Sequence, residues 1–121
     1  MPATITETLD LDALRATIDR DGSPALAAYL ADDVEWIEID QRTPPRAPAA
    51  LHGRDAVVAM LRDTKARGIV SRVGDGFVAG DRAALAVTCS FPEGGSLVAH
   101  GLVTLREGKI ARWVGVQAWD E

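Results

Sequence analysis

The C-terminal part of the chain reads AALAVTCSFPEGGSLVAHGLVTLREGKIARWVGVQAW, from residue 83 to residue 119. Three apolar runs in it, 83–91, 97–105 and 110–119, are separated by the turn signals Pro-Glu-Gly-Gly and Glu-Gly. Apolar runs of this length, bounded by such turns, are typical of consecutive strands joined by hairpins. This stretch therefore predicts an antiparallel sheet near the end of the chain.

More strands are expected before it. The segments 69–73 and 77–79 are predicted to be short strands, with Gly74-Asp75-Gly76 as a turn between them. A further strand is predicted at 34–40, where polar and apolar residues alternate. The segment 41–50 holds three prolines and is predicted to be a loop.

Helices are predicted in the first half of the chain. Apolar residues recur at helical spacing in 9–20, 24–30 and 53–65, and Ser23 is expected to cap the second of these helices. Helices followed by hairpin-linked strands indicate an α+β domain, with a helical layer on one face of an antiparallel sheet. Since no linker or repeat divides the chain, a single domain over 1–121 is expected.

Charge and composition exclude several classes of partner. The net charge is −5 and the thirteen basic residues are scattered, whereas nucleic-acid binding requires clustered Lys and Arg. No apolar run approaches the roughly 20 residues of a membrane span. The one cysteine, Cys89, is interpreted as a small buried hydrophobe, and Met1–Asp10 lacks the regions of a signal peptide. A cytoplasmic protein that binds neither nucleic acid nor membrane is therefore expected.

Three motifs follow one another along the chain. They are YLADDVEW at 29–36, LHGRDAVVAML at 51–61 and LREGKI at 105–110. Together they resemble the SnoaL-like branch of the nuclear transport factor 2 superfamily over nearly the whole chain. The resemblance implies a cone-shaped domain, a cystatin-like roll whose curved antiparallel sheet wraps around N-terminal helices and leaves a pocket at the open end. Members include steroid Δ-isomerases, limonene epoxide hydrolases, polyketide cyclases and non-catalytic binding domains.

Glu38 is the main catalytic candidate. The resemblance places it where steroid isomerases carry their general-base aspartate, on the first strand and facing the pocket. Alternation puts Glu38 on the same strand face as Trp36, and a carboxyl group beside a large apolar ring tends to have the raised pKa that a general base requires. A solvated position at the rim is the alternative. Asp40, on the same face, is either a second acid–base group or a turn residue that begins the proline loop.

The chain lacks the other catalytic residues of its best-studied relatives. The tyrosine and the protonated aspartate that hold the oxyanion in steroid isomerases fall near Leu14 and on Gly101. The Asp–Arg–Asp set of the epoxide hydrolases falls close to Thr88, Ser90 and Gly115. A true steroid isomerase is therefore not expected, and Glu38 would act with other partners.

His100 is the second catalytic candidate because histidine titrates near neutral pH. Strand alternation favours a different position, on the outer face of the sheet beside Val98 and Leu102, where it would lie in a homodimer interface. His52 is interpreted as a loop-to-helix contact. The two histidines are far apart and show no metal-ligand spacing, so neither a metal nor a cofactor is expected.

Large side chains are expected to line the pocket. Trp113 and Gln117 share one face of the last strand, and Gly115 between them would leave room for a ligand. The other expected lining residues are Trp36, Met60 and Phe77.

These features favour a small-molecule enzyme that uses cofactor-free acid–base chemistry on an apolar, polyketide- or terpenoid-like compound. The reaction would be of the isomerase, cyclase or hydrolase type, with Glu38 as the base and Gln117 as a polar orienting group. The alternatives are a non-catalytic ligand-binding protein of the same fold and a dimerisation domain.

Overall fold

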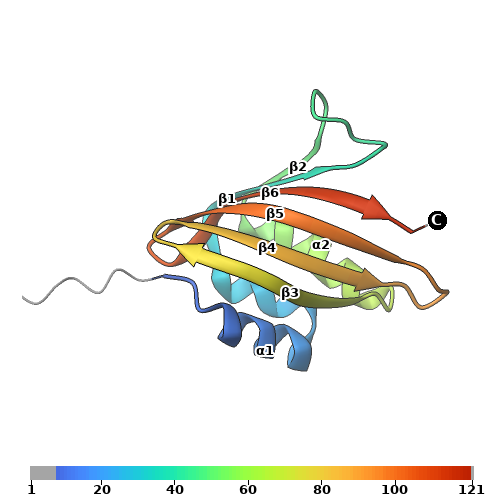
Figure 1. Cartoon of the computed structure of the whole chain (residues 1–121), viewed down its shortest axis with the longest axis horizontal. Helices are drawn as coiled ribbons and strands as arrows, with labels where there is room; N and C mark the ends of the chain where they lie inside the picture. The colour runs from blue at the N-terminus through green and yellow to red at the C-terminus, as the bar shows by residue number, and fades with distance from the viewer. Residues whose placement is uncertain (1–7, 121) are drawn as a thin grey trace, which may run out of the picture.

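A six-stranded sheet with helices on one of its faces forms the protein (Figure 1). The computed structural model describes residues 8–120. Most of the segment expected to lack a signal peptide, residues 1–7, therefore lies outside the described residues. The helical segments are α1 (Leu11–Asp21), the 3-10 helix η1 (Ser23–Tyr29) and α2 (Arg54–Ala66). The strands are β1 (Leu30–Ile39), β2 (Ala49–His52), β3 (Val70–Ala79), β4 (Arg82–Ser90), β5 (Ser96–Arg106) and β6 (Lys109–Trp119). The predicted α+β class is confirmed.

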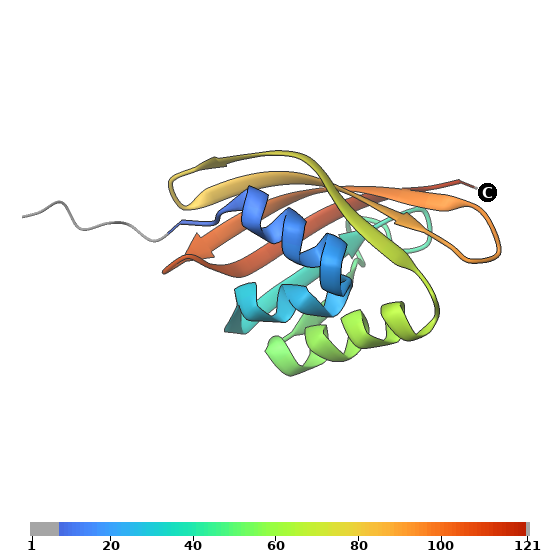
Figure 2. The ribbon, with the colours of Figure 1, turned by 90° about the horizontal axis from the view of Figure 1, so that it is seen from below.

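The strands are arranged in the order β2-β1-β6-β5-β4-β3. Figure 2 shows the sheet curving over the helices without closing into a barrel. All neighbouring strands are antiparallel except β1 and β6, which pair in parallel. This pair differs from the expected antiparallel sheet because no hairpin joins the two strands and sets their direction.

The second helix and its predicted cap differ from expectation. The segment forms a 3-10 helix whose N-cap is Gly22, and no side chain caps it. The Ser23 hydroxyl instead donates a hydrogen bond to the Leu61 carbonyl oxygen, at 3.0 Å and in a buried position. Ser23 therefore joins η1 to α2, and β1 follows directly at Leu30, four residues earlier than predicted.

Strand β2 begins in the last two residues of segment 41–50, which was expected to be a loop, and continues to His52. It pairs antiparallel with β1, from Glu35 beside His52 to Glu38 beside Ala49. The strand is only four residues long and is rich in alanine, so it carries little of the alternation that predicts strands. Pairing with β1 therefore decides its conformation.

Strand β3 is continuous where a turn was expected. The register between β3 and β4 shifts between Val73 and Gly76, so the two glycines mark a β-bulge. A Cβ atom on Gly76 would lie 2.7 Å from the Ala84 carbonyl oxygen, which explains why no side chain is present at this position. Arg15 of α1 donates hydrogen bonds to the carbonyl oxygens of Val73 at 3.1 Å and Gly74 at 2.7 Å, and so joins the helix to the bulge.

The core lies between the helices and the inner face of the sheet. Its most buried side chains come from both layers: Leu14, Val34, Val57, Val103 and Ile110. Toward one end of the sheet the two layers separate and enclose a cavity.

Candidate active site

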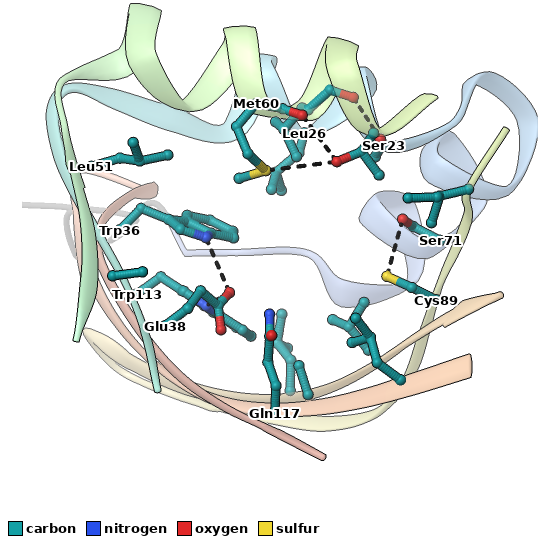
Figure 3. A pocket seen from close by; sticks show the side chains of 18 of the residues that line it. Ser23, Leu26, Trp36, Glu38, Leu51, Met60, Ser71, Cys89, Trp113 and Gln117 are labelled. Atoms are coloured by element: carbon teal, nitrogen blue, oxygen red, sulfur yellow. Dashed lines mark hydrogen bonds between the residues drawn. The ribbon is translucent and has the colours of Figure 1, made fainter. Parts of the chain in front are cut away.

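A cavity of about 480 Å³ lies between α2, η1 and the inner face of the sheet (Figure 3). This volume is within the range of small-molecule sites. Leu26, Leu51, Met60, Val87 and Leu97 supply apolar surface to it. Figure 3 shows Met60 pointing down from α2 toward the ring of Trp36. The cavity is therefore suited to a largely apolar molecule.

Two stacked tryptophans form one wall. The parallel register sets Trp36 of β1 directly beside Trp113 of β6, and their ring centroids lie 5.1 Å apart with an interplanar angle of 18°. Trp113 is only 3% exposed. Its ring passes over Gly101 of β5, where a Cβ atom would lie 2.0 Å from the Trp113 Cη2 atom. Trp113 therefore occupies the space that a side chain at position 101 would need.

Glu38 lies next to this stack. Its Oε1 atom accepts hydrogen bonds from the indole nitrogens of Trp36, at 3.1 Å, and Trp113, at 2.8 Å. Its Oε2 atom is buried and has no hydrogen-bond partner. A Cβ atom on Gly115, the β6 residue beside Glu38, would lie 2.5 Å from Oε2. The carboxyl group is thus fixed by two indoles at one oxygen and fits a notch above a glycine at the other.

Burial raises the pKa of the Glu38 carboxyl above its ordinary value. The two indole hydrogen bonds and the nearby Gln117 amide act in the opposite direction, because they stabilise the carboxylate. The negative charge of Asp40 adds to the rise in pKa. The effect of burial exceeds that of the hydrogen bonds, so Glu38 takes up a proton more readily than an exposed glutamate.

Gln117 lies on the same face of β6 as Trp113 and points toward Glu38 (Figure 3). Its Oε1 atom accepts a hydrogen bond from the Trp119 indole nitrogen at 3.2 Å. The Trp119 ring stacks on Phe91, with centroids 5.5 Å apart. The hydrogen bond from Trp119 orients the Gln117 amide, so that the amide nitrogen is free to face the Glu38 carboxyl group.

Residues 11–113 match the model of the SnoaL-like domain. The chain belongs to the SnoaL-like family. Among curated proteins, none matches the sequence.

Solved structures confirm the fold of this SnoaL-like domain. An NTF2-like protein from Mesorhizobium loti is 22% identical, with a TM-score of 0.69 over 89% of this chain and 87% of its own. A candidate ketosteroid isomerase from Kribbella flavida is 19% identical, with a TM-score of 0.69 over 92% of this chain and 75% of its own. A protein with a cystatin-like fold from Silicibacter pomeroyi is 24% identical, with a TM-score of 0.65 over 89% of this chain and 72% of its own.

In this SnoaL-like domain, Asp40 is a turn residue at the start of the proline loop and not a second acid–base group. Its Oδ1 atom accepts hydrogen bonds from the backbone nitrogens of Arg42 and Thr43, both at 2.8 Å, and from the Thr43 hydroxyl at 2.9 Å. These hydrogen bonds, led by that of the Thr43 backbone, lower the pKa of the Asp40 carboxyl. Asp40 reaches the edge of the cavity, but as an ionised group that already holds the loop in place.

Two predicted site residues lie outside the cavity. His100 is exposed on the outer face of β5, between Ala86 and Val116 of the neighbouring strands, so its placement as a catalytic group is corrected. Phe77 is 78% exposed and does not line the cavity. The bulge in β3 explains this error, because one extra residue after Val73 reverses which side chains face inward.

Cys89 lines the cavity as a half-buried thiol. Its sulfur lies 3.5 Å from the Ser71 hydroxyl oxygen, and burial raises its pKa. It therefore stays protonated and contributes mainly packing surface.

Sequence reasoning missed the pairing of the two indoles on Glu38. Trp36 lies two residues from Glu38 on one strand face, so alternation places the two together. Trp113 lies 75 residues away, and only the register of β1 against β6 brings it to the same oxygen. Nothing in the spacing of these residues indicates that register.

Within residues 8–120, no group of three or more His, Cys, Asp or Glu side chains is placed to hold a metal ion. No helix in that part of the chain is long and apolar enough to span a membrane.

Proposed function

We propose that this SnoaL-like domain is an enzyme of the isomerase type that acts on a small, largely apolar molecule with Glu38 as its general base. The observation that carries the proposal is a buried carboxyl oxygen without a hydrogen-bond partner, in the wall of an apolar cavity. Burial raises the pKa of this carboxyl toward the range in which a general base is most effective near neutral pH.

The reaction that fits is the transfer of a proton between two carbons of one substrate. Glu38 would take a proton from a carbon atom, leaving its bonding electrons on the substrate, and would return the proton at a second carbon. The two indole donors hold Oε1 as an acceptor, so the transferred proton would reside on Oε2. Because the substrate neither gains nor loses electrons overall, this proton transfer needs no oxidant or cofactor.

The stabilisation of negative charge on the substrate must differ from that in steroid isomerases. The position that resembles their aspartate is Gly101, and the Trp113 ring already fills the space beside it. The Gln117 amide nitrogen is a donor on the cavity wall that is oriented by its own hydrogen bond to Trp119. Gln117 is therefore our candidate for orienting the substrate.

Carbon-bound hydrogen exchange tests this function directly. A panel of small apolar ketones is incubated with the protein in D2O, and deuterium incorporation is followed by NMR. We expect exchange with the wild type and a loss of roughly 100-fold or more in Glu38→Gln, the usual size of a general-base contribution. Glu35→Gln is the matched control, because Glu35 lies on the same strand but outside the cavity.

The rival function is binding without turnover. It would be supported if ketones bind the wild type and Glu38→Gln alike while neither protein exchanges hydrogen. A polyketide- or terpenoid-like substrate and a cytoplasmic location are further proposals, drawn from the family resemblance and from the single cysteine.

We also propose that the protein forms a homodimer through the outer face of the sheet. One row of apolar residues crosses five neighbouring strands on this face: Ile37, Val114, Leu102, Ala84 and Phe77, here called the outer row. Leu102 is 68% exposed and Phe77 78% exposed. The outer row carries no charge, so a second copy of the same face is the partner that matches it.

A further inference from the structure

The polar groups on the cavity wall are not balanced between donors and acceptors. The Ser23 hydroxyl donates to the Leu61 carbonyl oxygen, and the Thr64 hydroxyl donates to the Met60 carbonyl oxygen at 2.9 Å. In addition, the indole N–H groups of Trp36 and Trp113 both donate to Glu38. Most donors of the described wall are thus used within the protein. The Gln117 amide nitrogen is the exception, and although it faces the carboxyl group, Glu38 Oε2 has no hydrogen-bond partner.

The charges on the wall show the same imbalance. Glu38 and Asp40 are both carboxyl groups. Arg67, the one cationic side chain on the described wall, directly follows α2, is 66% exposed and lies 3.8 Å from Asp63 of that helix. It therefore does not neutralise Glu38, and the interior of the cavity presents a carboxyl group without a cation.

We infer that the cavity selects a lipophilic amine, whose ammonium group donates to Glu38 while its apolar part fills the space beneath Met60 and beside Trp36. The inference rests on the proposed function in taking Glu38 as the group that meets the ligand. A cation at this point supplies the donor that Oε2 lacks, and the face of a tryptophan attracts it further. To meet the ligand, the carboxyl group turns about its broad terminal torsion, which moves Oε2 out of the notch above Gly115 and changes the hydrogen bonds from the two indoles.

The test compares benzyldimethylamine with isobutylbenzene, its uncharged carbon isostere, and with 3-phenylpropionate. Binding is followed by NMR through the three tryptophan indole N–H signals, since Trp36 and Trp113 donate to Glu38. We expect the amine to bind about tenfold or more tightly than the hydrocarbon, the usual effect of one charge-assisted hydrogen bond. The Trp36 and Trp113 signals should shift the most.

Two variants decide where the preference arises. In Glu38→Gln the preference for the amine should disappear while isobutylbenzene still binds, which also shows that the variant is folded. In Glu35→Gln, with the same change on the opposite face of β1, the preference should remain. Equal binding of amine and hydrocarbon to the wild type, a preference for the carboxylate, or no binding of any of the three compounds would overturn the inference.

These outcomes are independent of turnover. An amine preference that requires Glu38, without any hydrogen exchange in ketones or amines, would leave the ligand class standing and refute the proposed enzyme. Hydrogen exchange in neutral ketones without an amine preference would support the proposed enzyme and refute the inferred ligand class.

Discussion

Trp113 lies flat on the sheet because the residues beneath and beside it have no side chains. A Cβ atom on Gly101 would lie 2.0 Å from the ring, and one on Gly115 would lie 2.6 Å from its indole nitrogen. The indole N–H reaches Glu38 only from this flat position. The two glycines therefore set the position of the carboxyl group, although neither contributes a functional atom.

Replacement of Gly101 by alanine should displace the Trp113 ring. We expect Gly101→Ala to lower the free energy of unfolding by about 1–3 kcal/mol, as overpacking in a core does, and to weaken the hydrogen bond to Glu38. Gly74→Ala is the control, because a Cβ atom there meets nothing closer than 3.5 Å. Urea denaturation of the two variants measures the difference. An equal decrease in the free energy of unfolding in both variants would show that the space above Gly101 does not restrict the packing of Trp113.

Glu38 should also make stability depend on pH. Burial raises its pKa in the folded protein, so the folded state holds the proton more tightly than the unfolded chain. The stability that this group contributes is therefore present at low pH and is lost as pH rises through the folded-state pKa. Glu38→Gln lacks this loss, so its free energy of unfolding relative to the wild type should increase as the pH rises above the ordinary pKa of an exposed glutamate.

Chemical denaturation at several pH values measures this difference, with Glu35→Gln as the control on the same strand. A relative stability of Glu38→Gln that stays constant as the pH rises would contradict the raised pKa.

At the scale of elements, the bulge in β3 is held by a side chain from another element. Arg15 donates to the carbonyl oxygens of Val73 and Gly74, and its Nη1 atom lies 2.9 Å from the Asp12 carboxylate. Carbonyl groups at a bulge lose their ladder partners, and the guanidinium replaces them. This contact places α1 against β3 at one defined point.

We expect Arg15→Met to destabilise the protein by about 1–2 kcal/mol, because it removes hydrogen bonds from a charged donor to two carbonyl oxygens. Amide hydrogen exchange should rise first in β3. Arg20→Met, which loses only a surface pair with Asp21, should have little effect. Unchanged exchange in β3 would mean that the sheet holds the bulge without Arg15.

The elements differ in how far the sequence predicts them. The strands at 83–119 and helix α2 have clear periodicity and turn signals, and they form close to the predicted bounds. Strand β2 and the β3 bulge have no such signal, because they depend on hydrogen bonds to distant residues. The residues of the site differ in the same way. Alternation along β1 correctly places Trp36 with Glu38, whereas the bulge turns Phe77 to the outer face. The role of Trp113 depends on the register of β1 against β6, which no local pattern encodes.

At the scale of the whole molecule, the two faces of the sheet differ. The inner face covers the cavity and the core, whereas the outer row leaves Leu102 and Phe77 exposed. His100 lies next to this row, on the same face. A homodimer through this face would bury its apolar surface and leave the cavity of each copy on the far side of the sheet.

A charge in the outer row should therefore separate the copies. We expect Leu102→Glu to shift the protein from dimer to monomer in sedimentation, because an unpaired carboxylate would be buried in each half of the interface. Ala59→Glu, at an exposed position of α2, should leave the dimer intact. A wild type that sediments as a monomer at high concentration would refute the homodimer.

The parallel pairing of β1 with β6 has a consequence for the order in which the protein folds. Hairpins such as β4–β5 and the pair β1–β2 can form as soon as their residues are synthesised, but the pairing of β1 with β6 must wait for a strand that ends at Trp119. Contacts between residues so far apart close large loops late and slow the folding of a domain. During synthesis, Trp36 and Glu38 therefore remain without Trp113 and Gly115 of β6 until almost the whole domain has left the ribosome, and the cavity is among the last features to form.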